Sequence, residues 1–450
     1  MRASMKMLLA VVLCGAVSFA LPAAAVDASA DNEDRPTYWI TSAASDNDRP
    51  VTWIAAYTGE AAWVLDGGLA NVGTLAGQMY VGADVNLYKF FNWNGATLHV
   101  GMTDRHGESV SVRGIGNSTS VQEIYGGENV RLAQFTLQQR LFGGRLDLSV
   151  GREPANITFL GSEWCKYFQT NVACGNPTYV FKTSNFTWWP TSSWAAHATA
   201  WVTPEFYVMG GIYEVNPTHA LNSDHGFDWS LEGSTGYIVP YAIGHKTTYE
   251  NDHLPHKYEI GGWFDESDYK DPLLAANGQP ALLAGLPYAT HDGGRSGWFV
   301  RFEQTVWRPD DASKRSLALF GAVLGPFSGR LNESNYQMLG FYLNGPFEDR
   351  PDDSIAFLIA RQEYSNLALE NIAIARELAG GDGTQHRDQT MMELSYGIQF
   401  SSYVRIQPNL QYIVYPDQLN DPSRLHNLPN CVVAGLRFDV NFADAFKLND

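Results

Sequence analysis

Beyond residue 30, this 450-residue sequence contains no run of the roughly 18 apolar residues that a membrane-spanning helix requires. That absence excludes a helical membrane protein for this part of the chain. If the protein lies in a membrane, it must cross as a closed β-barrel, because only helices and closed barrels satisfy every backbone polar group within lipid.

Charged residues are also scarce, at 17% of the chain, and acidic ones dominate, with 48 Asp and Glu against 30 Lys and Arg. The formal net charge of -18 argues against nucleic acid as a partner, because a polyanion would be repelled. Nucleophile-elbow, zinc-protease and phosphate-binding glycine motifs are missing, and no His/Cys cluster suggests a metal. We therefore expect neither a metal nor another cofactor.

Cysteine is rare, with four residues in all. Cys165 and Cys174 lie nine positions apart in one predicted loop and could form a disulfide in an oxidising compartment, a pairing that the spacing leaves open. Cys431 would then be unpaired, as a small residue at the start of a strand.

The first 25 residues have the pattern of a secretory signal peptide. Arg2 and Lys6 precede an apolar stretch at 7–21, and three alanines at 23–25 form a small-residue cleavage site. A membrane anchor is the alternative, disfavoured by Gly15, Ser18 and Pro22. We expect a signal peptide at 1–25, an N-terminal segment at 26–51, a barrel at 52–442 and a C-terminal extension at 443–450.

Two runs near the C-terminus alternate strictly between apolar and polar residues. In residues 403–414 the apolar set is Val404, Ile406, Leu410, Tyr412 and Val414, opposite Arg405, Gln407, Asn409 and Gln411; in 432–442 it is Ala434, Leu436, Phe438, Val440 and Phe442, opposite Gly435, Arg437, Asp439 and Asn441. Long strands of this kind are typical of a lipid-exposed barrel with a wet lumen. A soluble β-sandwich could give the same alternation.

The same period recurs along the chain and predicts sixteen strands. They start near residues 52, 78, 96, 129, 145, 194, 205, 230, 256, 297, 315, 335, 354, 390, 403 and 431. Their connections alternate between long and short, as in bacterial barrels with tight periplasmic turns and extended outer loops, although 325–334 and 245–255 fit poorly. The predicted fold is all-β: a transmembrane antiparallel β-barrel of 16 strands with inward-folded loops.

Two connections are predicted to hold structure of their own. Residues 153–174 are too apolar for a free external loop, so we expect them to fold into the lumen, with a short helix. Residues 367–379 have helical propensity and are followed by two glycines.

Six segments in order resemble the carbohydrate-selective porins of the OprB family. They are LDGGL at 65–69, FNWNGAT at 91–97, FGGRLDLSVGR at 142–152 followed by Ser162 and Glu163, RPDD at 350–353, QPNLQY at 407–412 and GLRFDV at 435–440. The resemblance implies a porin of the bacterial outer membrane that passes glucose and related mono- or disaccharides by diffusion. It also implies a homotrimer, surrounded by outer-membrane lipid and lipopolysaccharide. The segments at 26–51 and 443–450 and the Cys165/Cys174 pair depart from the family pattern.

Strand parity predicts which residues face the lumen. The polar face carries Asp84, Lys257, Glu259, Trp263, Arg301, Glu303, Arg405, Arg437 and Asp439. Each could bind sugar or could merely keep the pore wet. Arg301 and Glu303 are the preferred sugar contacts, because adjacent inward charges of opposite sign create a transverse field.

Three further candidates come from the 142–174 region. Arg152 has the parity of the lipid-facing residues, so we expect it beyond the strand end, in the inward loop with Glu163; the resemblance favours both at the constriction. Trp164 could stack on a sugar ring or pack the loop against the wall. The predicted constriction is therefore Arg152, Glu163, Trp164, Glu259, Trp263, Arg301, Glu303, Arg405 and Arg437.

Two rival functions remain open. One is a general porin without sugar preference. The other is a secreted hydrolase that uses a carboxylate pair, taken from Glu123 and Glu128 or from Asp265, Glu266 and Asp268. Acidic clusters in loops are usually solvated surface, so we expect no enzyme.

Overall fold

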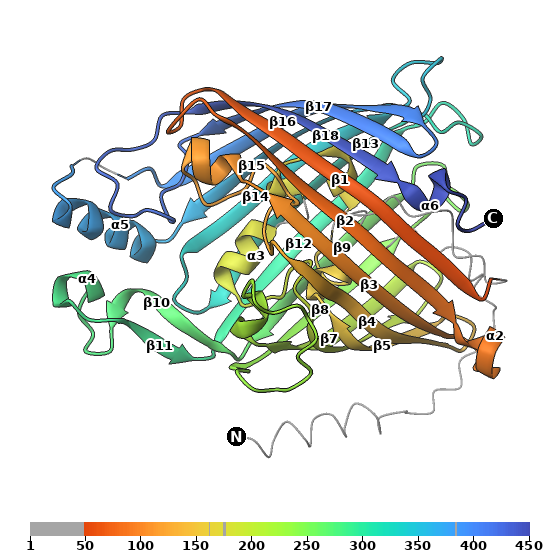
Figure 1. The fold of residues 1–450 in the computed structure, drawn as a ribbon, viewed down its shortest axis with the longest axis horizontal. Coiled ribbons are helices and arrows are strands. Elements are labelled where there is room, and N and C mark those ends of the chain that lie inside the picture. The colour runs from red at the N-terminus through yellow and green to blue at the C-terminus, as the bar shows by residue number, and fades with distance from the viewer. Residues whose placement is uncertain (1–48, 162, 174–176, 383–384) are drawn as a thin grey trace.

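A computed structural model describes residues 49–161, 163–173, 177–382 and 385–450. The predicted signal peptide, most of the segment at 26–51 and Cys174 lie outside the described residues. The remaining chain forms a closed antiparallel barrel of sixteen strands (Figure 1). The all-β transmembrane barrel predicted from the alternation is thus confirmed.

The barrel strands lie close to the predicted ones. They are β1 (Val51–Asp66), β2 (Gly73–Asn86), β3 (Ala96–Gly107), β4 (Val130–Leu141), β5 (Leu146–Glu153), β6 (Ser193–Trp201), β7 (Phe206–Val215), β8 (Gly236–Lys246), β9 (His256–Asp265), β12 (Arg295–Trp307), β13 (Ser316–Ser328), β14 (Glu333–Asn344), β15 (Ser354–Tyr364), β16 (Asp388–Ser401), β17 (Val404–Val414) and β18 (Cys431–Asn441). The largest departures from the predicted starts are β2, which begins earlier, and β8, which begins later.

Each strand pairs with its sequence neighbours, with one interruption. Between β9 and β12 the chain leaves the barrel as a separate hairpin, β10 (Asp268–Ala275) and β11 (Tyr288–Asp292), which the sequence reading took for loop. β1 pairs with β18 and closes the barrel, with Glu60 opposite Arg437. This register places the polar face of each predicted strand inside, because a closed barrel whose outer face meets lipid must turn its polar side chains inward.

The two ends of the barrel differ. In Figure 1 the hairpin β10–β11 and the helices α4 (Ala281–Ala284) and α5 (Asn366–Leu378) project from one end, whereas α2 (Leu87–Phe91), α6 (Phe442–Ala445) and the C-terminus lie at the other. α5 confirms the helix predicted near 367–379. We assign the long-loop end to the cell exterior and the short-turn end to the periplasm. No helix of the described residues is long and apolar enough to span a membrane.

Much of the lumen is occupied by chain. The connection between β5 and β6, called here the inward loop (residues 154–192), carries the short helices η3 (Ala155–Ile157), η4 (Glu163–Tyr167), η5 (Asn171–Ala173) and α3 (Pro177–Thr183). Its apolar side chains form one buried cluster with inward rings of the wall, including Phe320 and Tyr336. The predicted lumenal placement of 153–174 is therefore correct for its described residues.

Candidate functional site: the lumen constriction

Arg437 joins the barrel seam to the inward loop. Its guanidinium lies 3.4 Å from Glu60 and 3.1 Å from Asp439, and its Nη1 donates to the carbonyl oxygens of Cys165 and Phe168 at 3.2 Å each. The side chain is 2% exposed. Arg437 is thus surrounded by acceptors from two strands and the loop.

Glu393 of β16 holds the next part of the same loop. Its carboxylate accepts hydrogen bonds from the backbone N–H groups of Gln169 at 2.8 Å and Thr170 at 2.7 Å. Ser395, two residues along the strand, donates to the carbonyl of Tyr167 at 2.5 Å. Backbone groups that would be unsatisfied inside the lumen are therefore paired with the wall.

The opposite edge of the loop contacts β12, β13 and β14. The Trp164 indole N–H donates to Glu303, whose other carboxylate oxygen accepts from Tyr342 at 2.8 Å. The Trp164 ring stacks on Phe320 with centroids 4.5 Å apart, and Tyr167 stacks on Tyr342 at 4.3 Å. Trp164 therefore packs the loop against the wall, which is one of the two roles predicted for it.

Arg301, two residues before Glu303 on β12, forms an ion pair with Glu259 of the neighbouring strand β9. They are direct cross-strand partners, with Arg301 Nε 2.7 Å from Glu259 Oε1. Tyr207 donates to the other carboxylate oxygen at 2.5 Å, and Arg301 Nη1 donates to the carbonyl of Gly161 at 2.5 Å. Positive, negative and hydroxyl groups thus line one side of the lumen, next to the stacked rings.

A second segment, residues 108–129 between β3 and β4, also folds inward. Gln122 donates to the carbonyl of Glu60 at 2.7 Å, and the N–H of Ile124 donates to the Glu60 carboxylate at 3.2 Å. Within the described chain, neither carboxylate oxygen of Glu123 has a hydrogen-bond partner. Burial raises the pKa of Glu123, although Arg105 and Arg437 oppose the shift.

The wall residues predicted from parity all lie on the inward side of the register. Glu259, Arg301 and Glu303 gather on one side, whereas Arg437 and Asp439 gather at the seam. The others lie elsewhere on the inner surface: Asp84 pairs with His99 at 2.5 Å near the periplasmic end, Trp263 and Lys257 lie on β9, and Arg405 lies at the start of β17. The charges thus form several groups and not one ring.

The predicted position of Arg152 was wrong. Arg152 lies within β5, opposite Phe135 and Trp194, on the outward parity. It is nevertheless fully buried, because the connection at 216–235 folds over it: Arg152 donates to the carbonyl of Asp228, and its guanidinium lies 5.6 Å from the Trp229 ring centroid. A charged residue on the outer wall is tolerated here because a loop, and not lipid, covers it.

Glu163 begins η4, but its side chain lies outside the described part of the structure. Cys165 is disulfide-bonded and Cys431 is a buried free cysteine. Cys174, the predicted partner of Cys165, is outside the described residues, so that pairing stays a prediction.

Sequence reasoning missed Glu60, Glu393, Tyr207 and Tyr342. The period of two could have found Glu60 and Glu393, since each alternates with outward apolar residues in its strand. Nothing local marks the two tyrosines, because their partners Glu259 and Glu303 come from strands distant in sequence.

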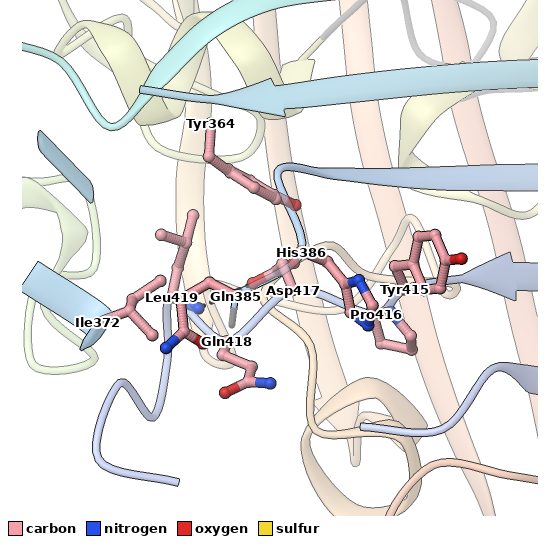
Figure 2. A pocket seen from close by; sticks show the side chains of 9 residues that line it. All are labelled: Tyr364, Ile372, Gln385, His386, Tyr415, Pro416, Asp417, Gln418 and Leu419. Atoms are coloured by element: carbon pink, nitrogen blue, oxygen red, sulfur yellow. Dashed lines mark hydrogen bonds between the residues drawn. The ribbon is translucent and has the colours of Figure 1, made fainter. Parts of the chain in front are cut away.

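A small hollow lies at the exterior end of the barrel, beside α5 (Figure 2). Its lining combines stacked rings of His386 and Tyr415 with Asp417, Gln418 and the buried Tyr364. In the part of the chain that is described, no group of three or more His, Cys, Asp or Glu side chains is arranged to hold a metal ion.

Comparison with known proteins identifies the family. Porin B of Pseudomonas aeruginosa is 30% identical to this chain over 401 residues, which are 86% of each protein. The putative porin QuiX of Acinetobacter baylyi is 28% identical over 411 residues, 86% of this chain and 88% of QuiX. The high-pH structure of Pseudomonas putida OprB superposes with a TM-score of 0.79 at 28% identity, covering 87% of this chain and 94% of that one. Residues 71–442 match the family described as "Carbohydrate-selective porin, OprB family". The chain therefore belongs to the OprB family of carbohydrate-selective porins and is a porin of the bacterial outer membrane.

Proposed function

We propose that this porin passes glucose and related mono- and disaccharides by passive diffusion. The path runs through the part of the lumen that the inward loop leaves open, because the loop itself is packed against β12, β13 and β14. The observation that carries the proposal is the row of Glu259, Arg301 and Glu303 beside stacked aromatic rings. Sugar hydroxyls both donate and accept hydrogen bonds, and paired opposite charges offer both kinds of partner without a strong net field.

Other predicted constriction residues have supporting parts in this proposal. Trp164 and Arg437 hold the inward loop, and Trp263 packs against Tyr179 of its helix α3. Arg405 lies on the wall near the start of β17. Glu163 stays a candidate by its position in η4. Binding at such a site must be weak, because a solute that binds tightly cannot leave at a useful rate.

Liposome swelling with the purified protein tests the sugar preference. Glucose should enter faster than an amino acid of smaller size, and the Glu259→Gln/Arg301→Gln double variant should reduce that advantage. Glu363→Gln, which changes a charge at the outer rim, should leave it intact. Equal entry of sugars and amino acids into wild-type liposomes would instead establish a general porin.

We further propose a homotrimer embedded in outer-membrane lipid and lipopolysaccharide. Support for the lipid contact comes from the outward faces, where apolar residues such as Val81, Ile260 and Val300 are exposed on the barrel surface. The homotrimer is proposed from the resemblance to the OprB family alone. The mass of the detergent-solubilised protein, measured by light scattering, distinguishes a trimer from a monomer.

We also propose that the chain has no hydrolase activity. Asp265, one of the candidate acids, is paired with Arg295 at 2.6 Å and accepts the N–H of Asn185 at 2.9 Å. Release of reducing sugar from an oligosaccharide by the purified protein, abolished by Asp265→Asn, would contradict this.

A further inference from the structure

Arg405 differs from Arg295, Arg301 and Arg437 of the inner wall. Arg301, Arg295 and Arg437 each lie within 3.4 Å of a carboxylate. No carboxylate of the described chain lies within 4.0 Å of the Arg405 guanidinium, whose partners are the neutral Ser354 and Gln399. Its positive charge is therefore without a contacting counter-charge.

The acids nearest to Arg405 are already engaged. Its cross-strand partner is Asp439, but that carboxylate accepts from Thr58 at 2.7 Å and from Arg437 at 3.1 Å. Asp353, at the turn before β15, accepts from Nε and Nη2 of Arg350 at 2.9 Å each and from Tyr396 at 2.7 Å. Neither carboxylate is left to neutralise Arg405.

The Arg405 side chain instead extends across β16 toward Ser354 of β15. Its Nη2 donates to Ser354 Oγ at 2.5 Å, and its Nη1 lies 3.4 Å from Gln399 Oε1. The side chain passes over Gly397, where an added Cβ atom would stand 1.9 Å from Arg405 Nη2. Because Gly397 has no side chain, the guanidinium can reach Ser354 while retaining unused N–H donors.

The position of Arg405 is at the periplasmic side of the constriction. It is the second residue of β17, directly after the short turn at 402–403. A guanidinium presents parallel N–H donors that match the two oxygens of a carboxylate. On these grounds, and resting on the proposed sugar pathway, we propose that Arg405 recognises the carboxylate of an anionic monosaccharide, a hexuronate or aldonate, as it leaves the pore.

Swelling of proteoliposomes in isotonic glucuronate and in isotonic glucose tests the proposal through the ratio of the two rates. Arg405→Gln should lower the glucuronate-to-glucose ratio about two- to fivefold, the range expected for one solvent-accessible ion pair. Arg405→Lys keeps the charge but not the paired donors, so its glucuronate-to-glucose ratio should lie between those of the wild type and Arg405→Gln. Lys447→Gln removes a positive charge from the exposed C-terminal segment and should leave the ratio unchanged.

An unaltered glucuronate-to-glucose ratio in Arg405→Gln would overturn the proposal, whether both rates stay the same or both fall equally. An unaltered ratio together with a changed chloride-to-potassium permeability ratio would mark a site for inorganic anions only. The proposed sugar pathway is tested separately, by comparing the rates at which glucose and an amino acid enter liposomes that contain the wild-type protein.

Discussion

Arg437 of β18 and Glu60 of β1 face each other across the seam that closes the barrel, with Nη1 3.4 Å from Oε1. The same guanidinium donates to the carbonyls of Cys165 and Phe168. One side chain therefore connects the first strand, the last strand and the inward loop, so the loop and the seam should lose stability together.

Replacing Arg437 by Met should destabilise the folded barrel by about 3–5 kcal/mol, because Glu60 would be left as a buried charge without its partner. The midpoint of urea unfolding, followed by tryptophan fluorescence in detergent, measures the loss. Arg361→Met is the matched control: Arg361 is about half-exposed on the outer rim and pairs with Asp388 at 2.6 Å. It should cost less than about 1 kcal/mol. If the two variants lost the same free energy of unfolding, Arg437 would have no special role in stability.

Replacing Trp164 by Ala should widen the lumen. The indole is almost completely buried against Phe320, and its removal leaves a space that the neighbouring rings cannot fill. Single-channel conductance should therefore rise, and the preference for glucose should fall. Trp53→Ala removes an exposed outward ring and should leave conductance unchanged. An unaltered conductance in Trp164→Ala would place the narrowest point elsewhere.

The outer hairpin should lose stability only in strong acid. Asp271 of β10 accepts hydrogen bonds from Arg330 and from His291 at 2.8 Å, as well as from two backbone N–H groups, and although burial opposes them these bonds lower its pKa from 3.8 to about 2. Because the folded-state pKa is depressed, this stabilisation is complete above pH 3.8 and is lost as the pH falls toward 2. It amounts to about 2 kcal/mol.

Limited proteolysis between β9 and β12 checks this prediction. Cleavage by pepsin should be slow at pH 4 and should accelerate toward pH 2. Asp271→Asn should make the hairpin sensitive at pH 4 already, whereas Asp268→Asn, an exposed carboxylate in the same strand, should behave like the wild type. Similar sensitivity of the two variants would argue against a role for the Asp271 contacts.

Cysteine labelling tests the predicted Cys165–Cys174 pairing. If the two are bonded, iodoacetamide should modify only Cys431 when the mature protein is unfolded without reductant, and three cysteines after reduction. Mass spectrometry of the intact chain counts the adducts. A Cys174→Ser variant that leaves Cys165 unreactive before reduction would mean that Cys165 has another partner.

Much of the wall was predictable from single strands. Parity placed Glu259, Arg301, Glu303 and Arg437 inside, since a side chain's face in a barrel depends only on its position along its own strand. The same rule would have found Glu393 had it been applied to every strand. It misjudged the surroundings of Arg152, because a loop that covers the outer wall leaves no mark in the alternation of β5.

The sequence by itself therefore determined the architecture, the compartment, the family and the inward or outward face of most strand residues. These follow from local periodicity and from motifs within short segments. Only the tertiary structure decided which inward charges meet: Arg437 is enclosed by Glu60, Asp439 and the loop carbonyls, whereas Arg405, on the neighbouring strand β17, has no carboxylate of the described residues within 4.0 Å. Such pairings depend on how the inward loop folds and on side chains from strands hundreds of residues apart, which no local pattern records.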